Sequence, residues 1–236
     1  MKKPRILIIS AVPEEIALIT EGFANKRLAV DKSIQVTTGS YSGYDLFLSV
    51  GGVGAVSMAT TVTALISRLA LDYVMLIGSG GGFSQAGIRV LDTAIATREI
   101  APELGVQTDT PGITRPLPIA PNRIELDQQL INRAARALSS SSRTINVHCG
   151  SFVTVSAVTT SPHTARTYYQ VHGAIVENME GFGAAYPCRL FGIPLLELRV
   201  VSNEVGNTNK DQWHLREASR RAQELALLLL ESEVFS

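Results

Sequence analysis

Short apolar runs of strand length alternate along this chain with longer stretches in which apolar residues recur at helical spacing. Continuous apolar runs are typical of strands that are buried on both faces. They predict strands at 5–10, 73–77, 92–97, 153–158 and 194–201. Helical periodicity and helix-start signals, such as the proline and two acids at 13–15, predict helices at 16–23, 55–69, 126–138, 180–191 and 215–230.

This alternation predicts one domain over residues 1–236 with a three-layer α/β fold, in which helices flank a central twisted mixed β-sheet. Residues 36–49 are expected to form a hairpin that turns at 42–45. Residues 101–122 are rich in proline and glycine, so we expect an irregular excursion on the surface. We find neither an internal repeat nor a linker between domains.

Composition and charge exclude several classes of function. The 236 residues are 45% hydrophobic and 18% charged, with a formal net charge of zero. This indicates a compact protein without the basic stripe that binds nucleic acid. The apolar run at 6–9 is too short for the core of a signal peptide, and the run at 225–230 is too short to cross a bilayer. We therefore expect a cytoplasmic protein with no membrane partner.

The four histidines and two cysteines do not form a recognisable ligand set. No pair of histidines has the spacing typical of a zinc site, so we expect no metal and no cofactor. Cys149 and Cys188 both lie in apolar contexts. They are expected to be buried, reduced thiols rather than a disulfide.

Two glycine-rich segments follow predicted strands. Residues 78–82 read GSGGG, which is more glycine than a tight turn needs, so we expect a loop whose backbone approaches a ligand closely. Residues 51–54 read GGVG before a helix, but the third glycine of a dinucleotide fingerprint would fall at Ser57, which argues against such a site. Either close packing of strand on helix or backbone N–H groups that face a ligand explains this second segment.

Polar side chains follow the ends of several predicted strands, at Glu14, Glu15, Glu180 and Asn203. Each has a local explanation, because acids at the start of a helix gain about 0.3–1 kcal/mol from the macrodipole and asparagine favours turns. Parallel strands, however, gather a site at their carboxyl ends. The set taken together therefore predicts an active site at this edge of the sheet.

Six motifs in a fixed order resemble a known family. They are ISAVPEE at 9–15, SVGGVG at 49–54, IGSGG at 77–81, VLDT at 90–93, VENMEG at 176–181 and RVVSN at 199–203. The chain resembles the nucleosidase branch of the purine nucleoside phosphorylase family over nearly its full length. It is similar to the 5'-methylthioadenosine/S-adenosylhomocysteine nucleosidases, and closer still to the futalosine hydrolases. Relative to the family's "VEMEG"-like signature, VENMEG has one inserted residue.

The resemblance implies roles for individual residues. Glu15 would be the acid/base that activates water, and Glu180 would bind the ribose hydroxyls. Asn203 occupies the position that contacts the purine at N7 and at its 6-substituent, where it would donate to the departing base. No metal or redox cofactor is implied.

The same resemblance implies which residues surround the substrate. Met179 would pack on the sugar, and Ser79 and Gly80 would line the pocket near the ribose. Val158 and Thr159 would lie near the base.

Two departures from the adenine-releasing pattern indicate the substrate. The adenine-specific enzymes have an aspartate where Asn203 stands, and an amide can donate to O6 and N7 of a 6-oxopurine, which a carboxylate would repel. They also have a phenylalanine that stacks on the base near Val158. Both departures, and the tail from Val205 to Trp213, resemble futalosine hydrolase. We therefore expect hydrolysis of futalosine, which releases hypoxanthine in menaquinone biosynthesis.

Three alternatives stay open. Because asparagine can also bond bidentately to the amino group and N7 of adenine, the first is a methylthioadenosine/S-adenosylhomocysteine nucleosidase. The second is a phosphorolytic enzyme, which would need clustered arginines, whereas those at 27, 68, 89 and 98 are scattered. The third is a nucleoside-binding protein without catalysis, against which Glu15 and Glu180 argue. The resemblance also implies a homo-oligomer, often a dimer, in which residues 101–122 contribute to the neighbour's pocket.

Overall fold

The computed structural model describes residues 3–23, 26–29, 34–109, 113–142 and 144–235. Ten strands of this described part form one mixed sheet, and a separate pair, β7 and β8, lies outside it. The sheet consists of β1 (Arg5–Ser10), β2 (Lys26–Ala29), β3 (Gln35–Tyr41), β4 (Tyr44–Val50), β5 (Tyr73–Gly82), β6 (Thr93–Ile100), β9 (Arg123–Glu125), β10 (Val147–Thr154), β11 (Ala174–Asn178) and β12 (Leu195–Glu204). Apart from β9, which pairs with β6, their order is β11-β10-β6-β12-β5-β1-β4-β3-β2.

Strand β5 runs through the middle of this sheet and is parallel to both β1 and β12. Its last residues, Gly81 and Gly82, also pair antiparallel with Glu177 and Val176 of β11. The sheet therefore closes on itself through β5, β11, β10, β6 and β12. This closure brings the carboxyl ends of β5, β11 and β12 together.

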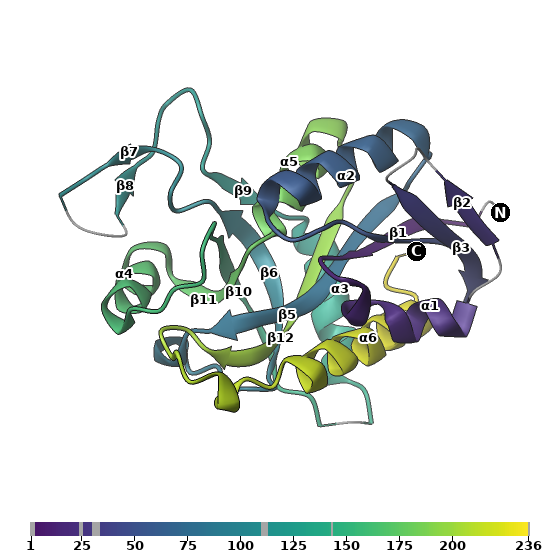
Figure 1. Cartoon of the computed structure of the whole chain (residues 1–236). Helices are drawn as coiled ribbons and strands as arrows, with labels where there is room; N and C mark the ends of the chain where they lie inside the picture. Colours follow the sequence, from purple (N-terminus) through teal and green to yellow (C-terminus); the bar gives the residue numbers. More distant parts are fainter. Residues whose placement is uncertain (1–2, 24–25, 30–33, 110–112, 143, 236) are drawn as a thin grey trace.

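Helices cover both faces of the sheet, as the alternating pattern predicts (Figure 1). One face is covered by α1 (Ala17–Phe23), α3 (Gln128–Ser139) and α6 (Leu215–Glu231), and the other by α2 (Ala55–Arg68) and α5 (Gly181–Phe191). Strand β1 shows why, because Ile6 and Ile8 pack with the α6 side while Leu7 and Ile9 pack with the α2 side. The three-layer α/β prediction is confirmed.

The glycine segment after residue 77 is part of a strand, so the predicted loop at 78–82 is wrong. Strand β5 continues to Gly82, and residues of the neighbouring strands β11 and β12 lie close to the α-carbons of its glycines. A Cβ at Gly80 would lie 2.8 Å from Val176 Cγ1, and one at Gly82 would lie 2.7 Å from Val201 Cγ1. The closed sheet therefore requires residues without side chains at these positions.

Other boundaries shift in the same region. Strand β10 ends at Thr154, so residues 155–158 lie beyond it, while β12 extends to Glu204 and includes Asn203. Strand β11 and helix α4 (Pro162–His172) are not among the predicted elements, although Ser161 caps α4 by accepting from Thr164 N at 3.3 Å. A capping serine followed by proline is a helix-start signal.

The predicted hairpin forms with a tighter turn than expected. Only Ser42 and Gly43 make the turn, both at positive φ, so Tyr44 and Asp45 already belong to β4. This geometry suits a two-residue hairpin loop.

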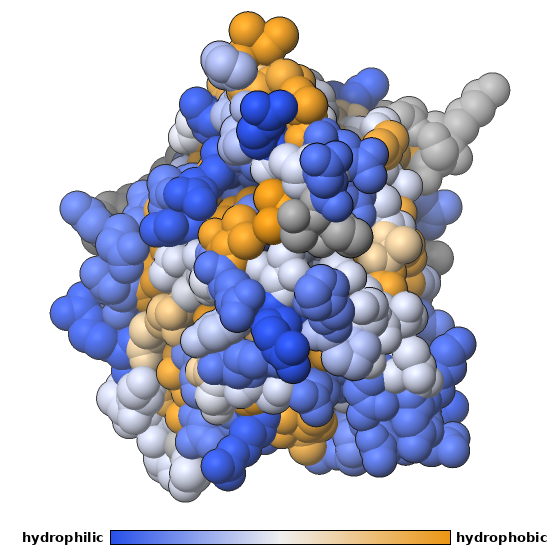
Figure 2. Space-filling model, turned by 90° about the vertical axis from the view of Figure 1, so that its left-hand side faces the viewer, coloured by the Kyte–Doolittle hydropathy of each residue, from blue (hydrophilic) through white to orange (hydrophobic). Residues whose placement is uncertain are grey.

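The proline- and glycine-rich excursion carries the short pair β7 (Val106–Gln107) and β8 (Thr114–Arg115). On the face that carries this pair and α4, apolar side chains are exposed among hydrophilic ones (Figure 2). Ile119 of the excursion is 91% exposed.

Both cysteines are free, but only Cys188 is buried. The expectation that Cys149 is buried is wrong, because the amino-terminal half of β10 lies at the surface. Within the described residues, no helix is both long and apolar enough to cross a membrane.

Candidate active site

A cavity of about 280 Å³ lies where the carboxyl ends of β1, β5, β11 and β12 meet. It is lined by most of the predicted site residues, namely Glu15, Ser79, Gly80, Val158, Met179, Glu180 and Asn203. Thr159 lies just behind its wall, where its backbone N–H donates to Glu177 Oε1 at 2.9 Å. Topology thus gathers residues that are up to 188 positions apart, a separation calculated as 203 − 15 from the chain numbering.

Glu15 is held in a fixed position on the 3₁₀ turn Pro13–Glu15 that follows β1. Its Oε1 accepts from Ser79 N at 2.8 Å and from Ser79 Oγ at 3.0 Å, and its Oε2 accepts from Ala11 N at 3.3 Å. A Cβ at Gly78 would lie 2.8 Å from Oε1, so the glycine lets the carboxylate reach the strand. The more lightly bonded Oε2 is the oxygen available to a ligand.

Glu180 follows β11 and precedes the first turn of α5. Its Oε1 accepts from Gly54 N at 3.1 Å, and its Oε2 faces both terminal nitrogens of Arg199 at 3.4 Å. The N–H of the second glycine segment therefore binds a protein carboxylate. Close packing of strand on helix also explains this segment, because a Cβ at Gly51 would lie 2.5 Å from Met58 Sδ of α2.

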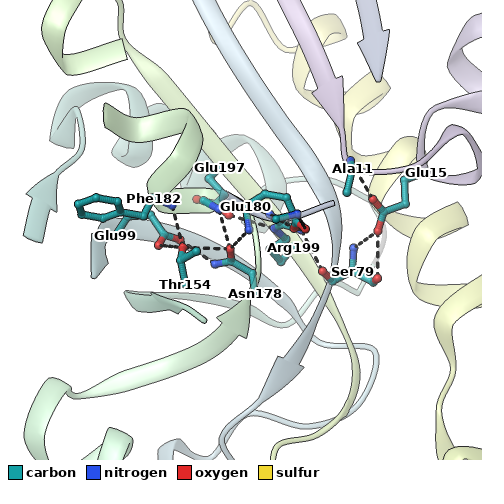
Figure 3. Close-up of polar contacts among 12 residues, drawn as sticks. Ala11, Glu15, Ser79, Glu99, Thr154, Asn178, Glu180, Phe182, Glu197 and Arg199 are labelled. Carbon is teal, nitrogen blue, oxygen red and sulfur yellow. Dashed lines mark hydrogen bonds and ion pairs between the residues drawn. The ribbon is translucent and has the colours of Figure 1, made fainter. Parts of the chain in front are cut away.

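Arg199 is the centre of the polar network, although it is not among the predicted site residues. It is 1% exposed, its Nε donates to Glu197 Oε1 at 3.0 Å, and one terminal nitrogen donates to Ser79 O at 3.1 Å. Burial acts to lower its pKa, but attraction by Glu197, Glu180 and Glu15 outweighs burial and raises it. The guanidinium is therefore permanently charged and joins Glu180 to the strand that holds Glu15 (Figure 3).

Two wholly buried carboxyl groups extend this network: Glu197 pairs with the arginine, and Glu99 lies beside Glu197. Glu99 accepts from Thr154 Oγ1 at 2.6 Å and from Asn178 Nδ2 at 2.8 Å. Burial first, and then repulsion by Glu197, raises the pKa of Glu99 well above its usual value. Among the described residues Glu197 Oε2 has no hydrogen-bond donor, so a proton shared with Glu99 satisfies it and leaves one negative charge on this pair of carboxyl groups.

Asn178, the residue inserted in VENMEG, connects this carboxyl pair to the start of α5. Its Oδ1 accepts from Glu180 N at 2.9 Å and from Gly181 N at 2.6 Å, while its Nδ2 donates to Glu99. The asparagine therefore satisfies N–H groups that a helix start leaves unpaired. Figure 3 shows the resulting chain of contacts from Glu99 to Glu180.

Asn203 is buried at a bulge in β12, where the pairing with β5 shifts between Val201 and Asn203. Its Oδ1 lies 2.7 Å from Ser202 Oγ, a hydroxyl that is also placed to donate to Gly80 O at 3.1 Å. Its Nδ2 donates to Glu204 O at 3.3 Å, its single contact within the described part of the chain. One amide N–H therefore remains for a ligand in the cavity.

Trp213 and Glu177 also line the cavity, although neither is among the predicted site residues. Trp213 comes from the segment before α6, where its Nε1 donates to Asn207 O at 3.2 Å. Glu177 is 5% exposed, and burial raises the pKa of its carboxyl group against the opposing hydrogen bonds from Thr159, with a further rise from the charge of Glu103. Its place beside Met179 and Glu180 in VENMEG was the available signal.

The cavity therefore combines three kinds of chemistry. Glu15 offers a carboxylate oxygen that can accept a proton, and Glu180 offers an acceptor whose charge Arg199 balances. Asn203 offers an amide donor at a separate part of the wall. Such a set can bind hydroxyls, activate water and stabilise negative charge on a leaving group.

The chain is similar to known proteins over nearly its whole length. A family model described as "Phosphorylase superfamily" matches residues 5–231. The 5'-methylthioadenosine/S-adenosylhomocysteine nucleosidase of Anoxybacillus flavithermus is 29% identical over 231 residues, covering 95% of this chain and 97% of that protein. The futalosine hydrolase of Streptomyces coelicolor is 30% identical over 227 residues, covering 90% and 89%.

Solved structures agree on the fold. The native structure of futalosine hydrolase from Helicobacter pylori matches with a TM-score of 0.87 at 19% identity, covering 97% of each chain. The chain therefore belongs to the phosphorylase superfamily.

Proposed function

We propose that this member of the phosphorylase superfamily is a nucleosidase that hydrolyses the N-glycosidic bond of futalosine, yielding hypoxanthine and dehypoxanthine futalosine for menaquinone biosynthesis. The coarser assignment, hydrolysis of an N-glycosyl compound, is supported by relatives of both kinds. The observation that favours a 6-oxopurine is Asn203, whose amide has a free N–H facing the cavity. An amide N–H can donate to O6 or N7, whereas a carboxylate there would repel O6.

In this mechanism the bond between the anomeric carbon and N9 breaks while water attacks that carbon. Glu15 Oε2 takes the proton from the water, and Ser79 holds Oε1 in place through its N–H and hydroxyl. The electron pair of the broken bond leaves with the purine. Asn203 stabilises this charge by donating a hydrogen bond, and the proton that the purine gains comes from solvent.

Glu180 acts on the sugar. As the bond breaks, the ribose becomes oxocarbenium-like, and a carboxylate bonded to its hydroxyls stabilises the positive charge. Arg199 lies 3.4 Å from Glu180 but divides its charge between two carboxyl groups, because it also pairs with Glu197 at 3.0 Å.

Hydrolysis is favoured over phosphorolysis by the charges around the cavity. Within the described part of the chain, Arg199 is the cationic side chain in the wall, and it already pairs with Glu180 and Glu197. Phosphate would have to compete with two carboxylates for one guanidinium. Water needs no such cation.

The runner-up is a methylthioadenosine/S-adenosylhomocysteine nucleosidase that releases adenine. The relative from Anoxybacillus flavithermus supports it, as does the ability of asparagine to bond to adenine bidentately. A phosphate-free incubation with futalosine and methylthioadenosine side by side, followed by chromatography of the free base, separates the two. We expect hypoxanthine from futalosine alone, and adenine from methylthioadenosine alone would replace the proposal by its runner-up.

We also propose that the protein is a homo-oligomer. Large apolar side chains of α2 and α5, two helices packed against each other, are exposed: Val56 at 82%, Leu190 at 72% and Tyr186 at 49%. A second copy would cover this surface and bring its own 101–122 excursion near the cavity. Sedimentation at micromolar concentration should give a dimer or larger species, and a monomer would contradict the proposal.

A further inference from the structure

The buried carboxyl groups of Glu99 and Glu197 meet next to the residue that follows Glu180. A Cβ at Gly181, the first residue of α5, would lie 2.1 Å from Glu99 Oε1 and 2.6 Å from Glu197 Oε2. Both carboxyl groups therefore lie where β11 leads into α5, and only a residue without a side chain fits beside them. Both are wholly buried outside the cavity wall, so neither touches a bound nucleoside.

A first set of hydrogen bonds connects Glu99 to the backbone at the start of α5. The N–H groups of residues 180–181 donate to Asn178 Oδ1 at 2.9 and 2.6 Å, and that of Phe182 donates to Thr154 Oγ1 at 2.7 Å. Asn178 and Thr154 both donate in turn to Glu99, at 2.8 and 2.6 Å. Three consecutive N–H groups thus depend on one carboxyl group through two side chains.

A second set of contacts connects Glu197 to the carboxylate of Glu180. Arg199 Nε donates to Glu197 Oε1 at 3.0 Å, and both terminal nitrogens of Arg199 lie 3.4 Å from Glu180 Oε2. Arg199 is 1% exposed and Glu197 is wholly buried, so solvent screens these interactions little. The place of the guanidinium beside Glu180 therefore depends on Glu197.

Burying this pair is costly, which indicates a purpose beyond stability. Burial disfavours the charged form of each carboxyl group, and two like charges repel each other. Apolar residues of similar volume are often as stabilising as buried charged groups, or more so. The residue that both sets of contacts share is Glu180, the proposed partner of the ribose hydroxyls.

We propose that Glu99 and Glu197 form a positioning pair for Glu180, in which Glu99 fixes its backbone and Glu197 fixes the arginine beside its carboxylate. The inference deepens the proposed function and rests on it for the role of Glu180 at the ribose, but not for the identity of the base. A displacement of about 1 Å can lower a rate by about 10²-fold, because stabilisation of the transition state depends on geometry. Loss of the pair should therefore slow catalysis through Glu180.

A double-mutant cycle with Glu180→Gln tests the inference. The measurement is kcat/KM for purine release in phosphate-free buffer. Glu99→Leu removes the acceptor of Asn178 and Thr154 and should lower kcat/KM roughly 10- to 100-fold, as the loss of two buried hydrogen bonds implies. In the Glu180→Gln background the same substitution should change kcat/KM by less than about threefold, because the carboxylate through which it acts is absent.

Two further variants separate positioning from lost stability. Ile95→Val changes the same strand, β6, at a wholly buried position in the apolar core on the α6 side, and it should leave kcat/KM unchanged. Glu99→Gln is the conservative variant, because its amide can donate to Glu197 Oε2 while its carbonyl oxygen accepts from Thr154. It should recover most of the activity that Glu99→Leu loses.

The cycle has a clear contrary result. If Glu99→Leu lowers kcat/KM by the same factor with and without Glu180→Gln, the pair only supports the fold and the inference is wrong. If Glu99→Leu does not fold, Thr154→Val takes its place, because it removes one bond of the first set from a side chain of similar shape. Thr154→Val should lower kcat/KM roughly 3- to 10-fold alone and by less than about twofold with Glu180→Gln, and equal factors would again overturn the inference.

The two proposals fail separately. If futalosine is not cleaved but methylthioadenosine is, the cycle is measured on methylthioadenosine, and non-additive effects support the inference while the proposed substrate is wrong. If futalosine is cleaved but the effects of the two substitutions multiply, the function stands and the inference is overturned. A protein that cleaves neither nucleoside overturns both proposals.

Discussion

Replacing Glu15 by glutamine removes the proposed base while changing the shape of the side chain little. Glutamine retains a carbonyl oxygen that can accept from Ser79 N and Ser79 Oγ, which lie at 2.8 and 3.0 Å from Oε1. The amide nitrogen would replace Oε2 and face the N–H of Ala11, so the 3.3 Å bond is lost. Loss of one such bond, with a buried N–H left unpaired, destabilises by about 1–3 kcal/mol.

The effect on catalysis should be far larger than the effect on folding. An amide cannot take the proton from water, and a general base typically contributes 10²–10⁴-fold. At about 1.36 kcal/mol per tenfold change in rate, this corresponds to roughly 3–5 kcal/mol in the barrier. Glu15→Gln should therefore release purine about 10²–10⁴-fold more slowly while it still unfolds cooperatively.

The assay is single-turnover release of purine in phosphate-free buffer, together with urea unfolding of the same samples. Ser79→Ala is the control, because it removes the hydroxyl bond to Glu15 but keeps the backbone N–H and the base, and it should lower the rate by no more than about tenfold. A Glu15→Gln protein that is folded and retains more than about a tenth of the wild-type rate would remove Glu15 from the mechanism.

Three further predictions concern the buried polar network and the strand beside it. Glu99 binds its proton more tightly in the folded than in the unfolded protein, so the free energy of unfolding should fall as pH rises through and above the usual range for glutamate. In urea unfolding from about pH 5 to about pH 9, Glu99→Gln should flatten this fall. Parallel curves for the variant and the wild type would contradict the shared proton. Arg199→Met strands the charges of Glu180 and Glu197 and should destabilise by about 3–5 kcal/mol in urea, whereas a loss below about 1 kcal/mol would show that both carboxyls are already neutral. Gly80→Ala places a Cβ 2.8 Å from Val176 Cγ1 and 3.0 Å from Glu177 O, so it should lower the free energy of unfolding by about 1–3 kcal/mol. An unchanged free energy of unfolding would mean that β5 and β11 separate easily at this point.

The sequence predicts those elements whose signals are local. Apolar runs and helical periodicity were sufficient for β1, α2 and α6, because the burial of these elements follows the period of their own residues. The glycines of β5 look like a loop in isolation, since only the crossing of β11 and β12 explains why they form a strand. The predicted ends of helices and strands are wrong where a strand distant in the sequence determines the conformation.

The candidate site shows the same division. Glu15, Glu180 and Asn203 could be placed from their positions after predicted strands and from the family resemblance. Glu99 and Glu197 could not, because an acid inside a strand usually indicates a solvent-facing position. Their burial depends on a partner 98 residues away, a separation calculated as 197 − 99, and no local pattern reports such a pair.

The central claim is that the wall around Asn203 selects a 6-oxopurine, and the most direct test is a pair of substrates that differ only at C6. The measurement is kcat/KM for futalosine and for its 6-amino analogue, in phosphate-free buffer, with the same 5' substituent in both. We predict a preference for futalosine of more than about 10²-fold, because the amide donor of Asn203 would be left unpaired against the amino group of the analogue. Equal values, or a preference for the 6-amino analogue, would contradict the account and favour an adenine-releasing nucleosidase.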